Sequence, residues 1–190
     1  DLLNSRASCE IPLLRKEFII DTYQIIEAKA YGADVILLIA AILSRDEIQA
    51  FSRLAQSLGM EVLLEIHNED ELQKSIMPSL NMIGVNNRNL KTFEVSLETS
   101  KTLSALIPDE FVKISESGIR TVEDIQSLQP YGYKGFLIGE SFGRSSCITQ
   151  SRFTSSHPVS RTWAIASASI SAESRPRFSS RLFGKSCPIS

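Results

Sequence analysis

Cysteine is scarce in this chain of 190 residues, and its distribution argues against two kinds of stabilised domain. The three cysteines are odd in number and far apart, without metal-ligand spacing (Cys9, Cys147 and Cys187). They indicate neither a disulfide framework nor a structural zinc site. We interpret them as reduced thiols of a cytosolic protein, because disulfides are rare in that compartment.

Long apolar runs are also missing. No stretch approaches the roughly 20 apolar residues that a membrane-spanning helix needs, and no signal peptide is recognisable. With 43% hydrophobic and 22% charged residues, the composition is that of a soluble globular domain with its own core. We therefore expect a cytoplasmic protein without a membrane partner.

Acidic residues are nearly absent from the last part of the chain. Residues 145–190 hold 14 serines and six Lys/Arg against one acid, whereas residues 1–144 hold 14 Lys/Arg against 21 acids. We expect one domain over 1–144 and a Ser/Arg-rich tail over 145–190 that is disordered or non-native. Within this tail, Ala164–Ala172 could form a short helix that partly covers an exposed strand.

Two explanations of the tail stay open. The abrupt change of composition near Arg144 favours a stretch that is out of frame, or an unrelated fusion, in place of a last helix. A basic arm for nucleic acid or acidic membranes is less favoured, because the five arginines of the tail are spread rather than clustered. We therefore expect no nucleic-acid partner.

Six short β-rich runs recur at a steady spacing within residues 12–144. They are nearly continuous in Val, Ile and Leu rather than alternating, which is typical of parallel strands buried on both faces. The expected strands are Pro12–Phe18, Asp34–Ala40, Glu61–Ile66, Met82–Asn86, Val112–Ser115 and Gly135–Ile138.

Segments with helical spacing separate these runs, and several have clear start signals. Asp21 and Asn68 stand where helix caps are expected, and Ser44 with Glu47 forms a capping box. The other expected helices are Leu97–Ile107, Val122–Leu128 and the end of a helix before Pro12. Strand and helix alternate, which predicts a parallel sheet of right-handed βαβ units.

The number of strands predicts an incomplete barrel. A closed (βα)8 barrel takes about 250 residues, whereas residues 12–144 accommodate six strands. The expected fold class is therefore α/β, a TIM (βα)8-barrel with about six of its eight strand–helix units. In such barrels the functional groups lie at the carboxyl ends of the strands.

Two ionisable residues interrupt apolar strands and are the first candidates for chemistry. Lys16 follows Leu-Leu-Arg, and Glu65 follows Val-Leu-Leu. A buried charge is costly unless it is paired or functional, and two such groups facing one cavity suit acid–base catalysis. The alternative is a buried ion pair with a structural role only.

Gly118 and Gly139 follow the last two strands, one βα unit apart. Backbone N–H groups at such positions, near helix starts, form the phosphate-binding site common in this architecture. Each glycine could instead merely allow a tight strand-to-helix turn. The two together favour phosphate binding.

Further polar residues lie next to these strand ends. Asn86 continues its strand and could face the cavity, whereas Asn87 and Asn89 have the composition of a turn. His67 could line the mouth of the barrel, but a surface or capping histidine is the favoured interpretation.

The combined motifs resemble indole-3-glycerol-phosphate synthase, a TIM-barrel lyase of tryptophan biosynthesis. The similarity covers about residues 1–144, which would correspond to strands 3 to 8 of that family. It is carried by the strings Pro-Leu-Leu-Arg-Lys-Glu-Phe-Ile-Ile-Asp, Gly-Ala-Asp-Val-Ile-Leu-Leu-Ile, Glu-Val-Leu-Leu-Glu-Ile-His, Gly-Val-Asn-Asn-Arg-Asn-Leu-Lys-Thr-Phe, Ser-Glu-Ser-Gly-Ile and Phe-Leu-Ile-Gly-Glu-Ser.

The resemblance implies a reaction and its acid–base groups. The family converts 1-(2-carboxyphenylamino)-1-deoxyribulose 5-phosphate to indole-3-glycerol phosphate by ring closure, decarboxylation and dehydration. By resemblance, Lys16 is the general acid that protonates the substrate ketone and attracts its carboxylate. Glu65 orients this lysine and takes part in proton transfer during dehydration. No metal or organic cofactor is implied.

The resemblance also implies a set of binding residues. Asn86 and Ser117 would hydrogen-bond the sugar-like chain of the substrate, beside Arg88. The expected apolar surface for the aromatic ring consists of Phe18, Leu37 and Leu90. The backbone groups expected at the phosphate are those of Gly118, Gly139 and Glu140.

Two departures from the family pattern limit what the chain alone is expected to do. The family's first strand supplies a Glu-x-Lys pair followed by Ser-Pro, and its last helix is amphipathic; neither element is recognisable here. We expect no or very weak activity from the isolated chain, because each missing transition-state contact is typically worth about 2.7–4 kcal/mol.

Two other functions remain open. A non-catalytic fragment could bind a phosphorylated ligand, or pair through its exposed strand edges with a chain that supplies the missing strands. Another phosphate-binding barrel, such as a related isomerase of amino-acid biosynthesis, would explain the glycines. It would not explain Lys16, Glu65 and Asn86 together.

Overall fold

The computed structural model describes residues 2–8, 11–138 and 166–168. Within this part, seven strands form one parallel sheet in the order β6-β5-β4-β3-β2-β1-β7. The strands are β1 (Leu13–Arg15), β2 (Val35–Ile39), β3 (Glu61–Ile66), β4 (Met82–Asn86), β5 (Val112–Glu116), β6 (Tyr133–Leu137) and β7 (Ala166–Ala168).

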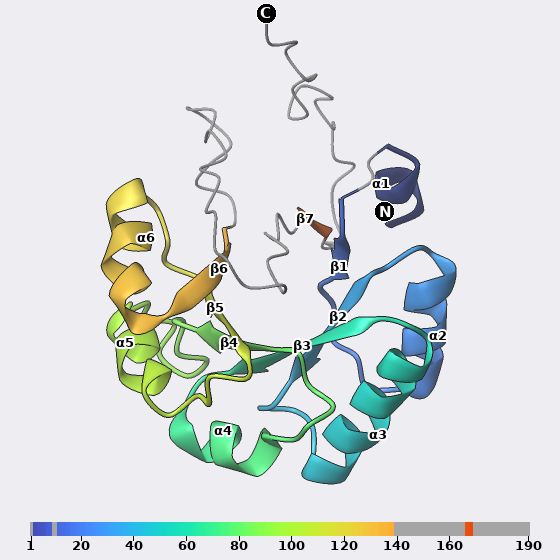
Figure 1. Cartoon of the computed structure of the whole chain (residues 1–190), viewed down its shortest axis with the longest axis horizontal. Helices are drawn as coiled ribbons and strands as arrows, with labels where there is room; N and C mark the ends of the chain where they lie inside the picture. Colours follow the sequence, from blue (N-terminus) through green and yellow to red (C-terminus); the bar gives the residue numbers. More distant parts are fainter. Residues whose placement is uncertain (1, 9–10, 139–165, 169–190) are drawn as a thin grey trace, which may run out of the picture.

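Helices follow the strands and cover the outer, convex side of the curled sheet (Figure 1). They are α1 (Leu2–Ser8), α2 (Thr22–Ala30), α3 (Arg45–Ser57), α4 (Glu69–Ser75), α5 (Glu98–Ser104), α6 (Val122–Leu128) and the 3₁₀ turn η1 (Gln129–Tyr131). The alternation of strand and helix from β1 to β6 confirms the predicted βαβ architecture. No helix in the described ranges is long and apolar enough to span a membrane.

The helix starts agree with the expected caps. The Ser44 hydroxyl accepts a hydrogen bond from Glu47 N, and the Glu47 carboxylate accepts one from Ser44 N in return. Asp21 forms an equivalent capping box, and Asn68 accepts from the backbone of Glu71. These bonds satisfy amide groups that the first helical turn leaves without partners.

The first strand is shorter than predicted. The sequence suggested Pro12–Phe18, but the ladder between β1 and β2 involves only Leu14 and Arg15 as paired residues. Leu13 N donates to the Asp34 side chain at 2.8 Å, which fixes the start of the strand. Lys16 therefore lies just beyond the carboxyl end of β1, where its side chain is free to leave the ladder.

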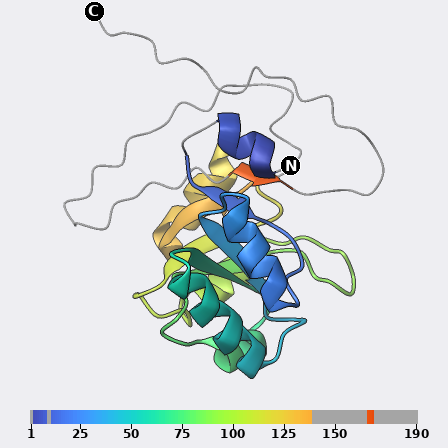
Figure 2. The same ribbon diagram turned by 90° about the vertical axis from the view of Figure 1, so that its right-hand side faces the viewer.

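The helix expected before Pro12 is confirmed as α1, which packs next to β1 (Figures 1 and 2). Arg6 attaches it to the sheet: its Nε donates to the Gly32 carbonyl at 3.0 Å, and its guanidinium pairs with Asp34.

The described part of the tail differs from the expectation. A short helix was predicted over Ala164–Ala172, but Ala166–Ala168 is a strand that pairs in parallel with Leu13–Arg15. The edge of β1 offers a row of backbone donors and acceptors. An extended segment can form hydrogen bonds with these groups, whereas a short helix would leave them without partners. The rest of the tail predicted as disordered or non-native lies outside the described residues.

Apolar side chains fill both faces of the sheet. The larger cluster lies between the sheet and the helices and includes Leu64, Ile83 and Phe51. The smaller cluster covers the inner face and contains Leu14, Val35, Leu37, Ile39, Leu63, Met82, Ile114 and Leu137. Because successive residues of a strand point to opposite faces, burial on both faces explains the continuous apolar runs of the sequence.

Leucine substitutions test this packing. Leu64→Ala should lower the free energy of unfolding by about 2–5 kcal/mol, because it leaves a cavity in the helix-covered cluster. Leu106→Ala, at a side chain that is 43% exposed, should change it by no more than about 0.5 kcal/mol. Urea unfolding followed by circular dichroism measures both. Equal losses for the two variants would contradict the assigned core.

Candidate active site

Four polar side chains share the inner face of the sheet at its carboxyl edge. Alternation along each strand places Lys16 on the side of Leu14, Glu65 on that of Leu63, Asn86 on that of Met82, and Glu116 on that of Ile114. The parallel register brings the strand ends into one row, with Asn86 directly opposite Glu116. The apolar inner cluster therefore ends in a polar site.

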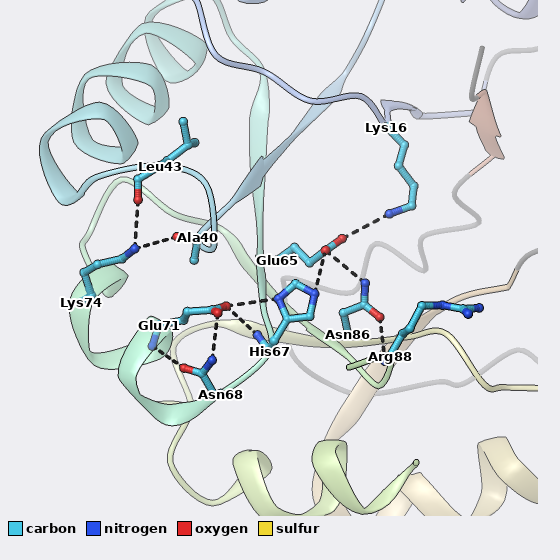
Figure 3. Close-up of polar contacts among 10 residues, drawn as sticks. All are labelled: Lys16, Ala40, Leu43, Glu65, His67, Asn68, Glu71, Lys74, Asn86 and Arg88. Carbon is cyan, nitrogen blue, oxygen red and sulfur yellow. Dashed lines mark hydrogen bonds and ion pairs between the residues drawn. The ribbon is translucent and has the colours of Figure 1, made fainter. Parts of the chain in front are cut away.

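Lys16 lies between two buried carboxyl groups. Its Nζ is 3.3 Å from Glu65 Oε2 and 3.1 Å from Glu116 Oε2 (the Glu65 contact is drawn in Figure 3). Burial alone would lower the pKa of Lys16, but the charges of Glu116 and Glu65 outweigh it and raise that pKa. The structure thus brings together Lys16 and Glu65, as the sequence predicted, and keeps the lysine cationic.

Glu116 is a site residue that the sequence interpretation missed. Its side chain is 2% exposed, and burial together with the neighbouring Glu65 charge raises its pKa to about 7, although Lys16 acts in the opposite direction. A signal was present: Val112, Ile114 and Glu116 alternate along β5, and Glu116 stands at the same strand end as the Ser117 that was selected. Near neutral pH the site therefore holds Glu116 partly protonated, close to its own pKa.

The strand position opposite Glu65 has no side chain, and this makes room for Glu116. Gly84 pairs with Glu65 in the sheet, and a Cβ built on Gly84 would overlap Glu116 Oε1. The same Oε1 is buried and has no hydrogen-bond partner within the structure. Glycine at this position is thus required by the close approach of the carboxyl group rather than by backbone conformation.

Asn86 connects the carboxylate to the following loop. Its Nδ2 donates to Glu65 Oε1 at 3.1 Å, and its Oδ1 accepts from Arg88 N at 3.0 Å. The Arg88 side chain is exposed and extends away from the Lys16–Glu65 pair (Figure 3). Asn86 therefore joins the candidate site as expected, whereas Arg88 lies at its rim.

Ser117 and Gly118 form a left-handed turn after β5. Their φ angles are 65° and 78°, a conformation that is costly for serine and that must be held by its surroundings. Asn87 holds it: its Nδ2 donates to the Ser117 carbonyl at 3.1 Å and to Ser115 Oγ at 3.0 Å. Asn87 was interpreted as a turn residue, but it is 2% exposed and bridges two strand ends.

The apolar residues expected at the aromatic ring have different environments. Leu37 is buried in the inner cluster, while Phe18 and Leu90 are 68% and 50% exposed. Large apolar side chains left open beside a polar strand edge are available to contact a ligand.

Two expected phosphate contacts, Gly139 and Glu140, lie outside the described residues. Gly118 is described, and its left-handed conformation fits a tight strand-to-helix turn. Its role in phosphate binding stays a prediction.

His67 is buried rather than at the surface. Its side chain is 8% exposed and lies between Glu65 and Glu71 (Figure 3). The sequence favoured a surface or capping histidine over one that lines the mouth of the barrel, but the side chain is buried in contact with two carboxyl groups. Across the described ranges, no group of three or more His, Cys, Asp or Glu side chains is arranged to hold a metal ion.

Replacing Asn87 tests the support of the Ser117 turn. Asn87→Ala would leave Ser115 Oγ, the Ser117 carbonyl and Ser100 N with fewer partners, so the free energy of unfolding should fall by about 1–3 kcal/mol. Asn89→Ala is the matched control, since Asn89 is exposed and bonds only within its own loop. Urea unfolding of both variants measures the two free energies of unfolding. If Asn87→Ala loses no more stability than Asn89→Ala, Asn87 does not support the turn.

The raised pKa of Glu116 predicts a pH-dependent stability. Between 4.5 and about 7 the unfolded chain releases the proton of Glu116 while the folded chain keeps it. The contribution of Glu116 to folding stability is therefore fully present below this window and is lost as pH rises through it. At about 1.36 kcal/mol per pH unit the fall amounts to about 3 kcal/mol. The side chain in Glu116→Gln cannot titrate, so this variant should lack this pH-dependent part of the free energy of unfolding.

Urea unfolding of the parent chain and Glu116→Gln at pH 4.5 and pH 8 measures the effect. The variant should gain stability relative to the parent as pH rises. A constant difference between the two proteins would show that Glu116 titrates normally in the folded state.

Solved structures with a similar fold share little of the sequence. The α-subunit of tryptophan synthase from Pyrococcus furiosus superposes with a TM-score of 0.59 at 19% identity, covering 74% of this chain and 60% of that one. KGPDC from Streptococcus mutans gives 0.53 at 13% identity, covering 71% and 65%. These likenesses concern the fold alone, and they agree with an incomplete TIM barrel.

Closer relatives are found by sequence. Indole-3-glycerol phosphate synthases of Chromobacterium violaceum and Polaromonas naphthalenivorans are 50% and 47% identical over 145 and 144 residues, 76% of this chain. The match spans 55% of each relative, so this chain covers about half the length of these enzymes. The family model described as indole-3-glycerol phosphate synthase matches residues 1–152. The chain belongs to the indole-3-glycerol-phosphate synthase family.

Proposed function

We propose that this chain carries the acid–base half of an indole-3-glycerol-phosphate synthase active site. The observation that carries the proposal is the position of Lys16 between Glu65 and Glu116 at the carboxyl edge of the sheet. The substrate is 1-(2-carboxyphenylamino)-1-deoxyribulose 5-phosphate, and the products are indole-3-glycerol phosphate, carbon dioxide and water.

In the first step Lys16 acts as the general acid. The ring carbon that bears the carboxylate attacks the ketone carbon, a C–C bond forms, and Lys16 donates a proton to the ketone oxygen. Carbon dioxide then leaves with cleavage of the bond to its ring carbon, which restores the aromatic ring. The charges of Glu65 and Glu116 keep Lys16 protonated for this task, and the cation also attracts the substrate carboxylate.

The second step is loss of water, for which the two carboxyl groups have suitable states. A protonated Glu116, with a pKa of about 7, can donate its proton to the new hydroxyl, which then leaves as water. A proton from solvent restores Lys16 and Glu116 after the proton on Glu65 is counted, because the overall reaction consumes one proton. Glu65, which accepts hydrogen bonds from Lys16 and Asn86, accepts the proton that the five-membered ring releases. Two carboxyl groups with different environments can thus take opposite roles in one reaction.

The remaining predicted residues bind the substrate in this proposal. Asn86 and Ser117 hydrogen-bond the sugar-like chain, and Arg88 stands at the rim. The exposed Phe18 and Leu90, with Leu37 below them, contact the aromatic ring. The phosphate lies at the backbone of Gly118, Gly139 and Glu140, where N–H groups near helix starts favour an anion.

Full activity requires the first two strands of the family barrel, and in this proposal a polypeptide that contains them can supply them. The family's Glu-x-Lys strand followed by Ser-Pro is not found in this sequence, and each missing transition-state contact costs about 2.7–4 kcal/mol. Pairing would take place along the edge of β1, on which the described residues place only the three-residue β7.

The experiment is an indole-fluorescence assay of the purified chain with the substrate, alone and with a polypeptide that contains the first two strands of a relative. The chain alone should show no or very weak turnover, and the mixture should show turnover. Lys16→Met should lower turnover of the mixture at least 100-fold, because the general acid and the substrate's cationic partner are lost.

Lys29→Met provides the matched control, since Lys29 is exposed on α2 and should leave the rate unchanged. Turnover that survives Lys16→Met would exclude the proposed mechanism. A mixture that binds the substrate without converting it would instead favour the non-catalytic binding function.

A further inference from the structure

His67 lies directly behind the carboxylate that faces Lys16. It follows the last residue of β3, and alternation along the strand turns its side chain to the same inner face as Glu65. Its Nε2 is 3.4 Å from Glu65 Oε1, and its Nδ1 is 3.2 Å from Glu71 Oε2 (Figure 3). The imidazole therefore bridges a carboxylate of the candidate active site and a carboxylate of helix α4.

Glu71 is the fixed end of this bridge. Its Oε2 also accepts from His67 N at 2.8 Å, and its Oε1 accepts from Asn68 Nδ2 at 2.9 Å. Burial would raise the pKa of Glu71, but the hydrogen bonds and charge of His67 and the Asn68 amide outweigh it and lower that pKa. Glu71 thus stays a carboxylate whose position is set by the first turn of the helix.

The opposite end, Glu65, has few other constraints on Oε1. Asn86 Nδ2 donates to it at 3.1 Å, while Oε2 is directed at Lys16. The separation of 3.4 Å between His67 and Glu65 is that of an ion pair, and Nε2 makes no hydrogen bond within the structure. The attraction across this gap therefore depends on whether the imidazole is charged.

The charges that face His67 favour the imidazolium. Three carboxyl groups surround it, from β3 (Glu65), α4 (Glu71) and β5 (Glu116), and among the described residues Lys16 is the cation that contacts Glu65 and Glu116. Burial by itself lowers the pKa of His67, but the Glu71 hydrogen bond and the charges of the three carboxyl groups raise it overall. A charged His67 offsets the second negative charge that Lys16 cannot balance.

We propose that His67, held by Glu71, is a positioning residue: its imidazolium fixes Glu65 Oε1 from behind so that Oε2 stays directed at Lys16. The importance of this for catalysis rests on the proposed function, in which Glu65 accepts a proton, whereas the linkage itself belongs to the isolated chain. Deprotonation of His67 releases Glu65 from one side, so the geometry of the acid–base pair depends on pH.

The test is an NMR titration of the whole chain. The sequence contains two histidines, His67 and His157, so His157→Gln leaves one imidazole to observe. Glu116→Gln is added because Glu116 itself titrates near pH 7 and would mask the effect. In the chain that carries His157→Gln and Glu116→Gln, the pKa of His67 should exceed the ordinary 6.5. Adding Glu71→Gln should lower this pKa, because burial disfavours the imidazolium and the Glu71 charge no longer offsets it.

The second readout reports on Glu65 rather than on His67. The side-chain amide signals of Asn86, which donates to Glu65 Oε1, should shift with the same midpoint as His67. The shift should disappear in His67→Gln. The Gln24 amide, which donates to the Phe18 carbonyl, is the control and should not shift in this range.

Two results would overturn the proposal, and neither depends on turnover. A His67 pKa no higher than 6.5 would show that the carboxylates do not charge it. An Asn86 amide that ignores the titration of His67 would show that the histidine packs without positioning Glu65. Should Glu71→Gln fail to fold, the parent titration and the Asn86 signal still decide.

In the two-polypeptide mixture, His67→Gln should lower kcat while leaving KM close to its parent value. The variant should also remove the limb of the pH profile that has the His67 midpoint. If kcat is unchanged while the Asn86 amide still shifts with His67, then His67 positions Glu65 but catalysis does not depend on it. That outcome would contradict the catalytic use of Glu65 and leave its positioning by His67 intact.

Discussion

The burial of two neighbouring carboxyl groups, Glu65 and Glu116, is the energetic constraint that the residues at the carboxyl edge of this sheet must satisfy. Removing an ionised carboxylate from water costs several kcal/mol, and a second one nearby adds repulsion. The structure offsets this with the ammonium of Lys16 between Glu65 and Glu116 and with a proton retained on Glu116. The absence of a side chain at Gly84 then gives Glu116 its space.

The surrounding fold makes such an arrangement possible because it separates stability from chemistry. The helix-covered cluster around Leu64 and Ile83 contains more buried apolar residues than the inner cluster. Folding therefore depends more on the helix-covered face, and the inner face can carry polar groups at its edge. Strands held in parallel register fix the spacing of their ends. Polar groups on that edge are therefore preorganised, which is what stabilisation of a developing charge requires.

The sequence was sufficient for the scaffold and for part of the site. Continuous apolar runs, capping residues and the interruptions at Lys16 and Glu65 depend on local pattern alone. They predicted the order of strands and helices from β1 to β6, the capped helix starts and the approach of Lys16 to Glu65, but not the early end of β1 at Arg15. The burial of Asn87 and His67 depends on contacts with other elements, so composition suggested a turn and a surface position instead. Glu116 was readable from the alternation along β5 but was passed over for the serine beside it.

Net charge explains why the proton resides on Glu116. Burial and the neighbouring Glu65 disfavour a further negative charge at this position, and Lys16 offsets them only in part. Loss of that proton would leave an uncompensated charge in a buried place, which accounts for a pKa of about 7. An anionic ligand beside Lys16 would add another negative charge and so strengthen the hold of Glu116 on its proton. In the proposed function, a substrate carboxylate would therefore arrive at a site that keeps an acid ready for the later step. Its departure as neutral carbon dioxide would make that proton easier to give up.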